Sequence, residues 1–327
     1  MRHIFSIITI AFIIISCKST IEPVVYNRAN EEIDKDVSMI IYLLQSDNLT
    51  GALEKINSSL SKHPDSIELQ SALGWYYIIS RDIDRAYEII DGLYKRNIVN
   101  PLILSGLARI YRLKGDYENA LRFADLTISS AQFLSIGYLE AGLSYYNQGD
   151  YNRAIIYFNR ADILEPGNKD IIIFKYFCYL NLNKDMDEIK HLWEQVTRQQ
   201  PLKDWYFISH AYILYNQNKF EDAKTVVNHG LTEFRGNRYL ININNCLLIK
   251  EYDISQDQTV LEEAYRSAET IINSDDGTIE AGFYDTFYQI CERAGYTDQI
   301  AHSVRIIFSR YSNSEEIIGW IEKYYNL

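Results

Sequence analysis

Alanine recurs in this chain at a fixed interval of 34 residues. Four successive copies carry it at the same place, at Ala52, Ala86, Ala120 and Ala154. A fifth copy has Glu188 there, and the register returns one residue late at Ala223. A unit of this length cannot bury its own apolar face, so the copies must stack on one another to be stable. The period therefore predicts a stack of similar units with the apolar residues spread along it.

Small and large residues keep fixed places within the copies. Small residues occupy one position in the first half of four copies, at Gly74, Ala108, Gly142 and Ala211. Large residues that can fill the spaces between helices stand at Tyr77, Tyr111, Tyr145 and Phe158. Gly115 and Gly149 are each followed by aspartate. This pattern predicts a turn in which glycine takes a positive φ and aspartate caps the next helix.

Glycine and proline are scarce, with 15 and 5 in 327 residues, which favours long helices over a many-turned β-fold. Four of the prolines fall at copy boundaries, at Pro64, Pro101, Pro166 and Pro201. Proline begins or interrupts a helix because it lacks a backbone N–H group. Each copy is therefore predicted to be two helices joined by a short turn.

These copies resemble the tetratricopeptide repeat (TPR) family, whose units are helix-turn-helix hairpins of about 34 residues. The fourth copy, residues 135–168, is the clearest, with motif residues at Ala141, Gly142, Tyr145, Gly149, Asp150, Tyr151, Ala154, Phe158, Ala161 and Pro166. The fifth, residues 169–202, keeps apolar spacing but lacks the signature. The resemblance implies an all-α, right-handed superhelical solenoid of about six copies over residues 33–237.

Beyond residue 237 the period fades, but apolar spacing still predicts helices over 238–252, 259–274, 278–294 and 298–311. Ser312 and Glu315 form a capping box that begins a last helix. Its apolar stripe consists of Ile317, Trp320, Ile321 and Tyr324. Residues 238–327 are thus interpreted as degenerate hairpins and a capping helix, with a partner-binding role for that helix as the alternative.

The N-terminus has the pattern of an exported protein. Residues 1–16 carry Arg2 and then an apolar run from Ile4 to Ile15, which is too short to span a bilayer and typical of a signal peptide. The alternative is a buried N-terminal helix. The sequence Ile14-Ile15-Ser16-Cys17 resembles the lipobox of bacterial lipoproteins. That resemblance implies cleavage before Cys17, a diacylglycerol on its sulfur and an acyl chain such as palmitate on its amino group.

Residues 17–32 contain Pro23 and are interpreted as a lipidated tether. Several acyl chains anchor a protein stably, whereas one chain is marginal. Lys18 follows the cysteine where some lipoproteins have aspartate, and this resemblance favours the outer membrane. The expected location is the bacterial cell envelope, lipid-anchored at the outer membrane and facing the periplasm.

Composition disfavours a nucleic-acid partner, because 32 basic against 44 acidic residues give a formal charge of −12. Cys178, Cys246 and Cys291 lack metal-site spacing and are expected to be free thiols. His210 is interpreted as a core histidine. The common hydrolase and nucleotide-binding motifs do not occur, so we expect no catalysis, metal or cofactor.

In TPR proteins the first helix of each hairpin lines a concave face on which partners bind. Carrying the groove-facing positions over by this resemblance gives Trp75, Arg109, Arg112, Tyr146, Asn147, Asn181, Tyr212, Tyr215 and Asn216. Leu143 and Phe177 fall at such positions too. Amides can pair with an extended backbone, and aromatic side chains can anchor it. The alternatives are that the aromatics pack on neighbouring helices, that the asparagines simply end helices, and that the arginines pair within the solenoid.

The two-carboxylate clamp of chaperone-binding TPR domains is not expected. Its places hold Val37 and Ile41 in the first copy and Ser71 and Trp75 in the second. The predicted function is a scaffold or adaptor that binds a protein or peptide on the concave face. A solute-binding or transporter-associated component with its ligand inside the superhelix is the second hypothesis, and an enzyme is a distant third.

Overall fold

The chain folds entirely into helices and turns over the residues that the computed structural model describes, 31–98, 100–198, 201–275 and 277–311. The helices are α2 (Glu31–Gln45), α3 (Leu49–Lys62), α4 (Ile67–Ser80), α5 (Ile83–Lys95), α6 (Pro101–Leu113), α7 (Tyr117–Ser130), α8 (Ser135–Asn147), α9 (Tyr151–Leu164), α10 (Lys169–Asn181), α11 (Met186–Thr197), α12 (Asp204–Asn216), α13 (Phe220–Glu233), α14 (Arg238–Ser255), α15 (Gln258–Asn273), α16 (Ala281–Ala294) and α17 (Thr297–Tyr311). This confirms the all-α prediction. The predicted signal peptide, Cys17 and the final helix after Tyr311 lie outside the described residues.

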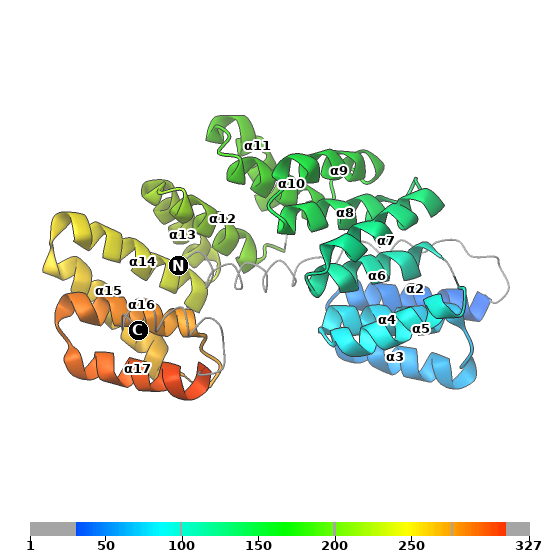
Figure 1. The fold of residues 1–327 in the computed structure, drawn as a ribbon, viewed down its shortest axis with the longest axis horizontal. Coiled ribbons are helices and arrows are strands. Elements are labelled where there is room, and N and C mark those ends of the chain that lie inside the picture. Colours follow the sequence, from blue (N-terminus) through cyan, green and yellow to red (C-terminus); the bar gives the residue numbers. More distant parts are fainter. Residues whose placement is uncertain (1–30, 99, 199–200, 276, 312–327) are drawn as a thin grey trace. The chain divides into compact units, whose positions relative to one another are not determined.

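Consecutive helices pack as hairpins within two units (Figure 1), each described by itself. The N-terminal unit contains α2–α11, and the C-terminal unit contains α12–α17. The degenerate fifth copy still forms a hairpin, α10 with α11, because its apolar spacing is intact. Helix α2 begins at Glu31, one residue before the predicted end of the tether at residue 32, and acidic residues in its first turn favour that start.

The predicted turns are confirmed at both glycines. Gly115 and Gly149 have φ of 78° and 77°. The following aspartates cap the second helices, and Asp150 Oδ1 accepts from the backbone N–H of Arg153 at 3.0 Å. Asn183 and Asn218 take the same left-handed conformation in the next two hairpins, with φ of 57° and 59°. Asparagine tolerates this region better than most residues, so the turn survives where the glycine is missing.

The 34-residue alanines lie where the two helices of a hairpin approach closely. Ala52, Ala86, Ala120, Ala154 and Ala223 are all fully buried. On the opposing helix of the fourth hairpin, a Cβ added to Gly142 would lie 2.6 Å from Cε1 of Phe158. Small residues at these places therefore set the spacing of the two helices, and larger neighbours such as Phe158 fill the remaining volume.

The C-terminal unit continues the same construction. Helices α14 to α17 coincide to within three residues with the four helices expected beyond residue 237. They share an apolar core that includes Leu248, Leu261, Phe283 and Ile290. None of the described helices is both long enough and apolar enough to cross a membrane.

The contact at Gly142 provides a test of the close approach. Gly142→Ala should lower the free energy of unfolding by about 1–2 kcal/mol, because Phe158 has to shift and overpacking outweighs the gain in helix propensity. Gly92→Ala in α5 is the matched control, since no atom lies within 4 Å of the added Cβ. It should be stabilising by about 0.5–1 kcal/mol. Urea unfolding of both variants measures the difference, and equal effects would contradict the packing role.

Candidate partner-binding face of the first helices

The first helices of successive hairpins pack directly on one another within each unit. In the N-terminal unit α2 contacts α4, α4 contacts α6, α6 contacts α8, and α8 contacts α10. In the C-terminal unit α12 contacts α14, and α14 contacts α16. Within each unit, a second helix that is followed by another hairpin packs between its own first helix and the next one, as α3, α5, α7, α9, α13 and α15 do. The first helices thus form one continuous layer in each unit, and every predicted site residue inside the described ranges lies on it.

Arg109 and Arg112 of α6 share one carboxylate, that of Glu140 on α8. Arg109 Nη2 lies 2.6 Å from Glu140 Oε1, and Arg112 Nε donates to Oε2 at 3.0 Å. The three residues are 3%, 2% and 0% exposed. We call this group the Arg109–Glu140–Arg112 cluster. It joins two hairpins through charge-assisted hydrogen bonds in a setting where an unpaired charge would be costly.

Burial and the two guanidiniums shift the pKa of the Glu140 carboxyl group in opposite directions. Burial alone would raise the pKa of its carboxyl group, but the positive charges and hydrogen bonds of Arg109 and Arg112 lower it below its ordinary value. Glu140 is therefore ionised at neutral pH. The indole ring of Trp75 lies 4.8 Å from the Arg109 guanidinium carbon, and its Nε1 donates to the carbonyl of Leu102 at 3.2 Å.

These positions correct the expectation that Trp75, Arg109 and Arg112 face an open groove. All three are buried, and the arginines pair inside the stack. The partner, Glu140, was not among the predicted residues. The sequence does contain a signal for Glu140, because the matching positions in neighbouring copies hold the small or apolar residues Ala72, Gly106 and Phe174. A carboxylate at such a place requires a buried cation nearby.

Tyr146 is also buried instead of facing a groove. Its ring packs edge-on against Tyr151 and Phe174 at 5.5 and 5.3 Å between centroids. Burial raises the pKa of its hydroxyl well above the ordinary value, and a hydrogen bond from Asn181 opposes that effect. The Asn181 amide also donates to the carbonyl of Phe177 at 2.7 Å. Leu143 and Phe177 are fully buried, as in the packing alternative.

The three asparagines are the last residues of α8, α10 and α12. Asn147 is half-buried, and its Oδ1 is enclosed without a hydrogen-bond donor. Asn216 is exposed in the C-terminal unit, where it interacts with the half-buried Tyr212. Tyr215 is half-buried as well and lies 5.5 Å from the ring of Phe220. The end of α12 therefore presents an exposed amide beside two partly accessible tyrosines.

A family model for the tetratricopeptide repeat matches residues 137–168, which is most of the fourth hairpin. The fourth hairpin is therefore a tetratricopeptide repeat. Solved structures agree on the fold. A TPR protein from Parabacteroides merdae ATCC 43184 is 14% identical, with a TM-score of 0.54 over 80% of this chain and 99% of that one.

Two further solved structures are similar to this chain. The apo form of the quorum sensor NprR from B. thuringiensis is 15% identical, with a TM-score of 0.55 over 84% of this chain and 96% of that one. PilW, a type IV pilus biogenesis factor, is 13% identical, with a TM-score of 0.51 over 68% of this chain and all of that one. At this identity the likeness concerns the fold. No curated protein matches the sequence.

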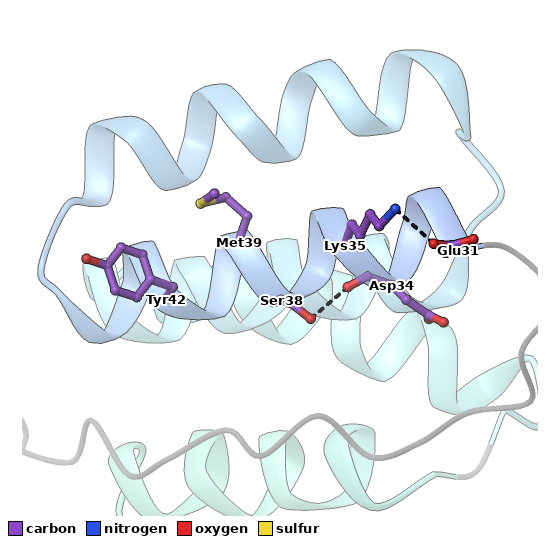
Figure 2. A pocket seen from close by; sticks show the side chains of 6 residues that line it. All are labelled: Glu31, Asp34, Lys35, Ser38, Met39 and Tyr42. Carbon is purple, nitrogen blue, oxygen red and sulfur yellow. Dashed lines mark hydrogen bonds and ion pairs between the residues drawn. The ribbon is translucent and has the colours of Figure 1, made fainter.

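A second surface feature lies outside the predicted site residues. Figure 2 shows an open hollow on α2 whose lining residues are Glu31, Asp34, Lys35, Ser38, Met39 and Tyr42. Lys35 pairs with Glu31 at 2.9 Å. Met39 and Tyr42 are exposed, three residues apart on the same helix. Their spacing on a first helix is the signal that could have been noticed.

The cysteines within the described ranges are thiols that burial keeps protonated. Cys178, Cys246 and Cys291 are free, which confirms the expected thiols. Burial raises the pKa of Cys246 to about 11 and that of Cys291 to about 12, so both are protonated at neutral pH. No group of three or more His, Cys, Asp and Glu side chains in the described part of the chain is placed to hold a metal ion.

His210 in α12 is buried, as predicted for a core histidine, and burial lowers its pKa to about 3. In the unfolded chain histidine titrates near about 6.5. Between these values the unfolded chain binds more protons, so the free energy of unfolding is highest above about pH 6.5 and falls as the pH is lowered towards about 3.

His210→Phe should remove this dependence. Between about pH 6 and 4, the free energy of unfolding of the wild type should fall more steeply than that of the variant. The difference in slope should be up to about 1.4 kcal/mol per pH unit. Urea unfolding across that range measures the slopes. His302→Phe, at an exposed position of α17, is the control and should retain the wild-type slope. Equal slopes for His210→Phe and the wild type would contradict the burial argument.

Proposed function

We propose that this chain is a TPR scaffold or adaptor of the bacterial cell envelope that binds a partner protein through the first helices of each unit. The observation that carries the proposal is the polar and aromatic character of the ends of those helices. Asn147 has an enclosed Oδ1 without a donor, and Tyr212, Tyr215 and Asn216 are accessible on α12. A partner's backbone N–H can supply the missing hydrogen bond of Asn147.

The architecture supports a binding role over catalysis. Stacked hairpins present long continuous surfaces, and a layer of first helices suits an extended chain. Asparagine offers a donor and an acceptor, so its amide can pair with a backbone of any sequence. Partly buried tyrosines add contact area at low conformational cost. The similar fold of PilW, a pilus biogenesis factor, is consistent with an envelope role of this kind.

The buried residues of the predicted site have a different part in this proposal. Trp75 and Tyr146 pack the layer, and Asn181 bonds to Tyr146 and to its own helix. They hold neighbouring first helices in register. Direct contact is assigned to Asn147 in the N-terminal unit and to Tyr212, Tyr215 and Asn216 in the C-terminal unit.

Photo-crosslinking in the native envelope, followed by identification of the captured protein, tests the assignment. Tyr215→Ala/Asn216→Ala should reduce the capture of the partner at least about tenfold, because both a contact surface and a hydrogen-bonding group are lost. Asn228→Ala, at an exposed position of the second helix α13, is the matched control and should leave capture unchanged. Equal capture by the wild type and the double variant would contradict the proposal.

The location is a separate part of the proposal. Lipidation at Cys17 would anchor the protein at the outer membrane, facing the periplasm, with residues 18–30 as the link to α2. Mass spectrometry of the membrane fraction should find a lipid-modified Cys17 as the first residue. Cys17→Ser should retain residues 1–16 and lose the lipid. Wild-type protein that keeps Met1 and stays free of membranes would overturn this part.

A further inference from the structure

Helix α9 exposes two large apolar side chains on the side that faces away from the first helices. Ile156 and Ile163 are 66% and 68% exposed. They are seven residues apart, which places them on one side of the helix and two turns from each other. On the opposite side, the fully buried Phe158 packs against the ring of Phe174 in α10. The two isoleucines therefore belong to the surface and not to the packing of the hairpin.

The other copies that carry the 34-residue alanine have polar side chains at these two places. Ile156 and Ile163 are the second and ninth residues after that alanine. The matching pairs are exposed and polar, namely Glu54 and Ser61 in α3, Glu88 and Lys95 in α5, Arg122 and Ser129 in α7, and Thr225 and Thr232 in α13. Stacking of the hairpins thus requires no apolar side chain here. Apolar groups that packing does not need are typical of a surface that contacts another body.

Arginines accompany the isoleucines on the same side of α9. Arg153 precedes Ile156 by three residues, and Arg160 follows it by four. The exposed residues of α9 are Asn152, Arg153, Ile156, Asn159, Arg160 and Ile163. None of them is acidic, although the whole chain has a formal charge of −12. The exposed side of α9 is therefore basic and apolar in an acidic protein.

The acidic side chains at the margins of this surface are already paired. Asp150 lies 2.5 Å from Nε of Arg153, and Asp162 lies 2.7 Å from Nζ of Lys175 in α10. Among the described residues, no carboxylate forms an ion pair with Arg160, whose guanidinium carbon lies 6.0 Å from the ring of Tyr138. The positive charge of Arg160 is thus available to an anion from outside the chain.

The turn between α7 and α8 adds a third large apolar side chain. Phe133 is 69% exposed. Two residues later, the hydroxyl of Ser135 donates to Oε2 of Glu165, the residue that follows α9, at 2.6 Å. This hydrogen bond brings the turn to the end of α9 that carries Ile163. We call Phe133, Arg153, Ile156, Arg160 and Ile163 the α9 patch.

A phospholipid surface with anionic headgroups fits the chemistry of the α9 patch. Apolar side chains enter the boundary between headgroups and acyl chains, and neighbouring arginines bind the phosphates. The aliphatic stem of arginine lies along the apolar region while its guanidinium stays at the level of the headgroups. A second copy of the chain fits less well, because a two-fold contact through this patch would bring the arginines of both copies together.

The proposed lipid anchor keeps such a surface close to α9. Thirteen residues, 18–30, link Cys17 to the start of α2. A flexible link of that length spans about 20 Å on average. Helix α9 belongs to the same unit as α2. The bilayer is therefore present at a high effective concentration, so even a small patch can bind it.

We propose that the α9 patch lies against the phospholipid surface of the membrane to which the chain is tethered. The inference rests on the proposed location and goes beyond it, because it assigns the side of the N-terminal unit that contacts the bilayer. The exposed side of α9 is directed away from α8 and α10. Contact with lipid at this patch therefore leaves the first helices available to a partner protein.

Photolabelling from the lipid tests the assignment. The full-length chain is incorporated into vesicles of phosphatidylethanolamine and phosphatidylglycerol that include a phospholipid with a photoreactive diazirine near its headgroup. Irradiation, proteolysis and mass spectrometry then locate the lipid adducts. In the wild type, Asn159 and Arg160 should carry adducts, since they lie between the two isoleucines.

Ile156→Gln/Ile163→Gln should reduce these adducts at least about tenfold, because the apolar insertion is lost while helix propensity is kept. Ile254→Gln is the matched control, since Ile254 is an exposed isoleucine of α14 and lies outside the patch. It should leave the adducts on α9 unchanged. Equal labelling of α9 in the wild type and the double variant would overturn the inference.

The arginines are tested separately. Arg160→Gln should reduce the adducts on Asn159 about fivefold in the vesicles that contain phosphatidylglycerol, because one attraction to the anionic surface is lost. Arg198→Gln, at the exposed end of α11, changes the net charge equally and should have no effect. In vesicles of phosphatidylcholine alone, the wild type should be labelled as weakly as Arg160→Gln. Equal labelling of the wild type in both kinds of vesicle would overturn the role of the arginines.

Flotation of the vesicles measures attachment independently of the labelled position. Wild-type protein that floats with the vesicles but carries no adduct on α9 would overturn the inference and leave the proposed location intact. Protein that does not float would contradict both. If a second copy covers α9 instead, the vesicle-bound wild type should form dimers that Ile156→Gln/Ile163→Gln lacks, and α9 should carry no lipid. That result would also overturn the inference.

Discussion

The structure depends on how closely the two helices of one hairpin approach. Where alanine or glycine lies at the crossing, as at Ala154 and Gly142, the helices come close enough for Phe158 to fill the space beside them. A hairpin built in this way still exposes one apolar side, which the next hairpin covers. Because the second helix packs between two first helices, the first helices are brought into contact with one another. The layer that carries the candidate site is therefore a consequence of the small residues.

The packing of that layer explains why some predicted site residues are buried and others are exposed. A side chain in the middle of a first helix, such as Arg109 or Trp75, meets the neighbouring first helix and becomes buried. A side chain in the last turn, such as Asn216, lies where the chain leaves the layer for the turn, and it stays exposed. In the last turn the exposure depends on the neighbouring residues, because Tyr146 is buried against Tyr151 and Phe174 whereas Asn216 is exposed.

The hairpins could be predicted from the sequence because their signals are local and repeated. Gly149 and Asp150 mark a turn, and Ala154 marks a crossing, all within a few residues. The α10–α11 hairpin was foreseen from apolar spacing alone. The burial of Arg112 could not be foreseen, because its partner Glu140 lies 28 residues away and on another hairpin. Pairing between copies depends on the rotation of one hairpin against the next, which a period does not encode.

A periodic scaffold also gives physical meaning to the positions that depart from its pattern. Each place on a first helix is repeated in its neighbours, so the neighbours show what packing alone requires there. Leu44, Ile78 and Leu180 show that apolar side chains fill this place in other copies. Arg112 differs from them, and its burial costs desolvation free energy. Glu140 departs in the same way at its own position and offsets only part of that cost. These linked departures join two hairpins through charge at a place where the other copies are joined by uncharged side chains.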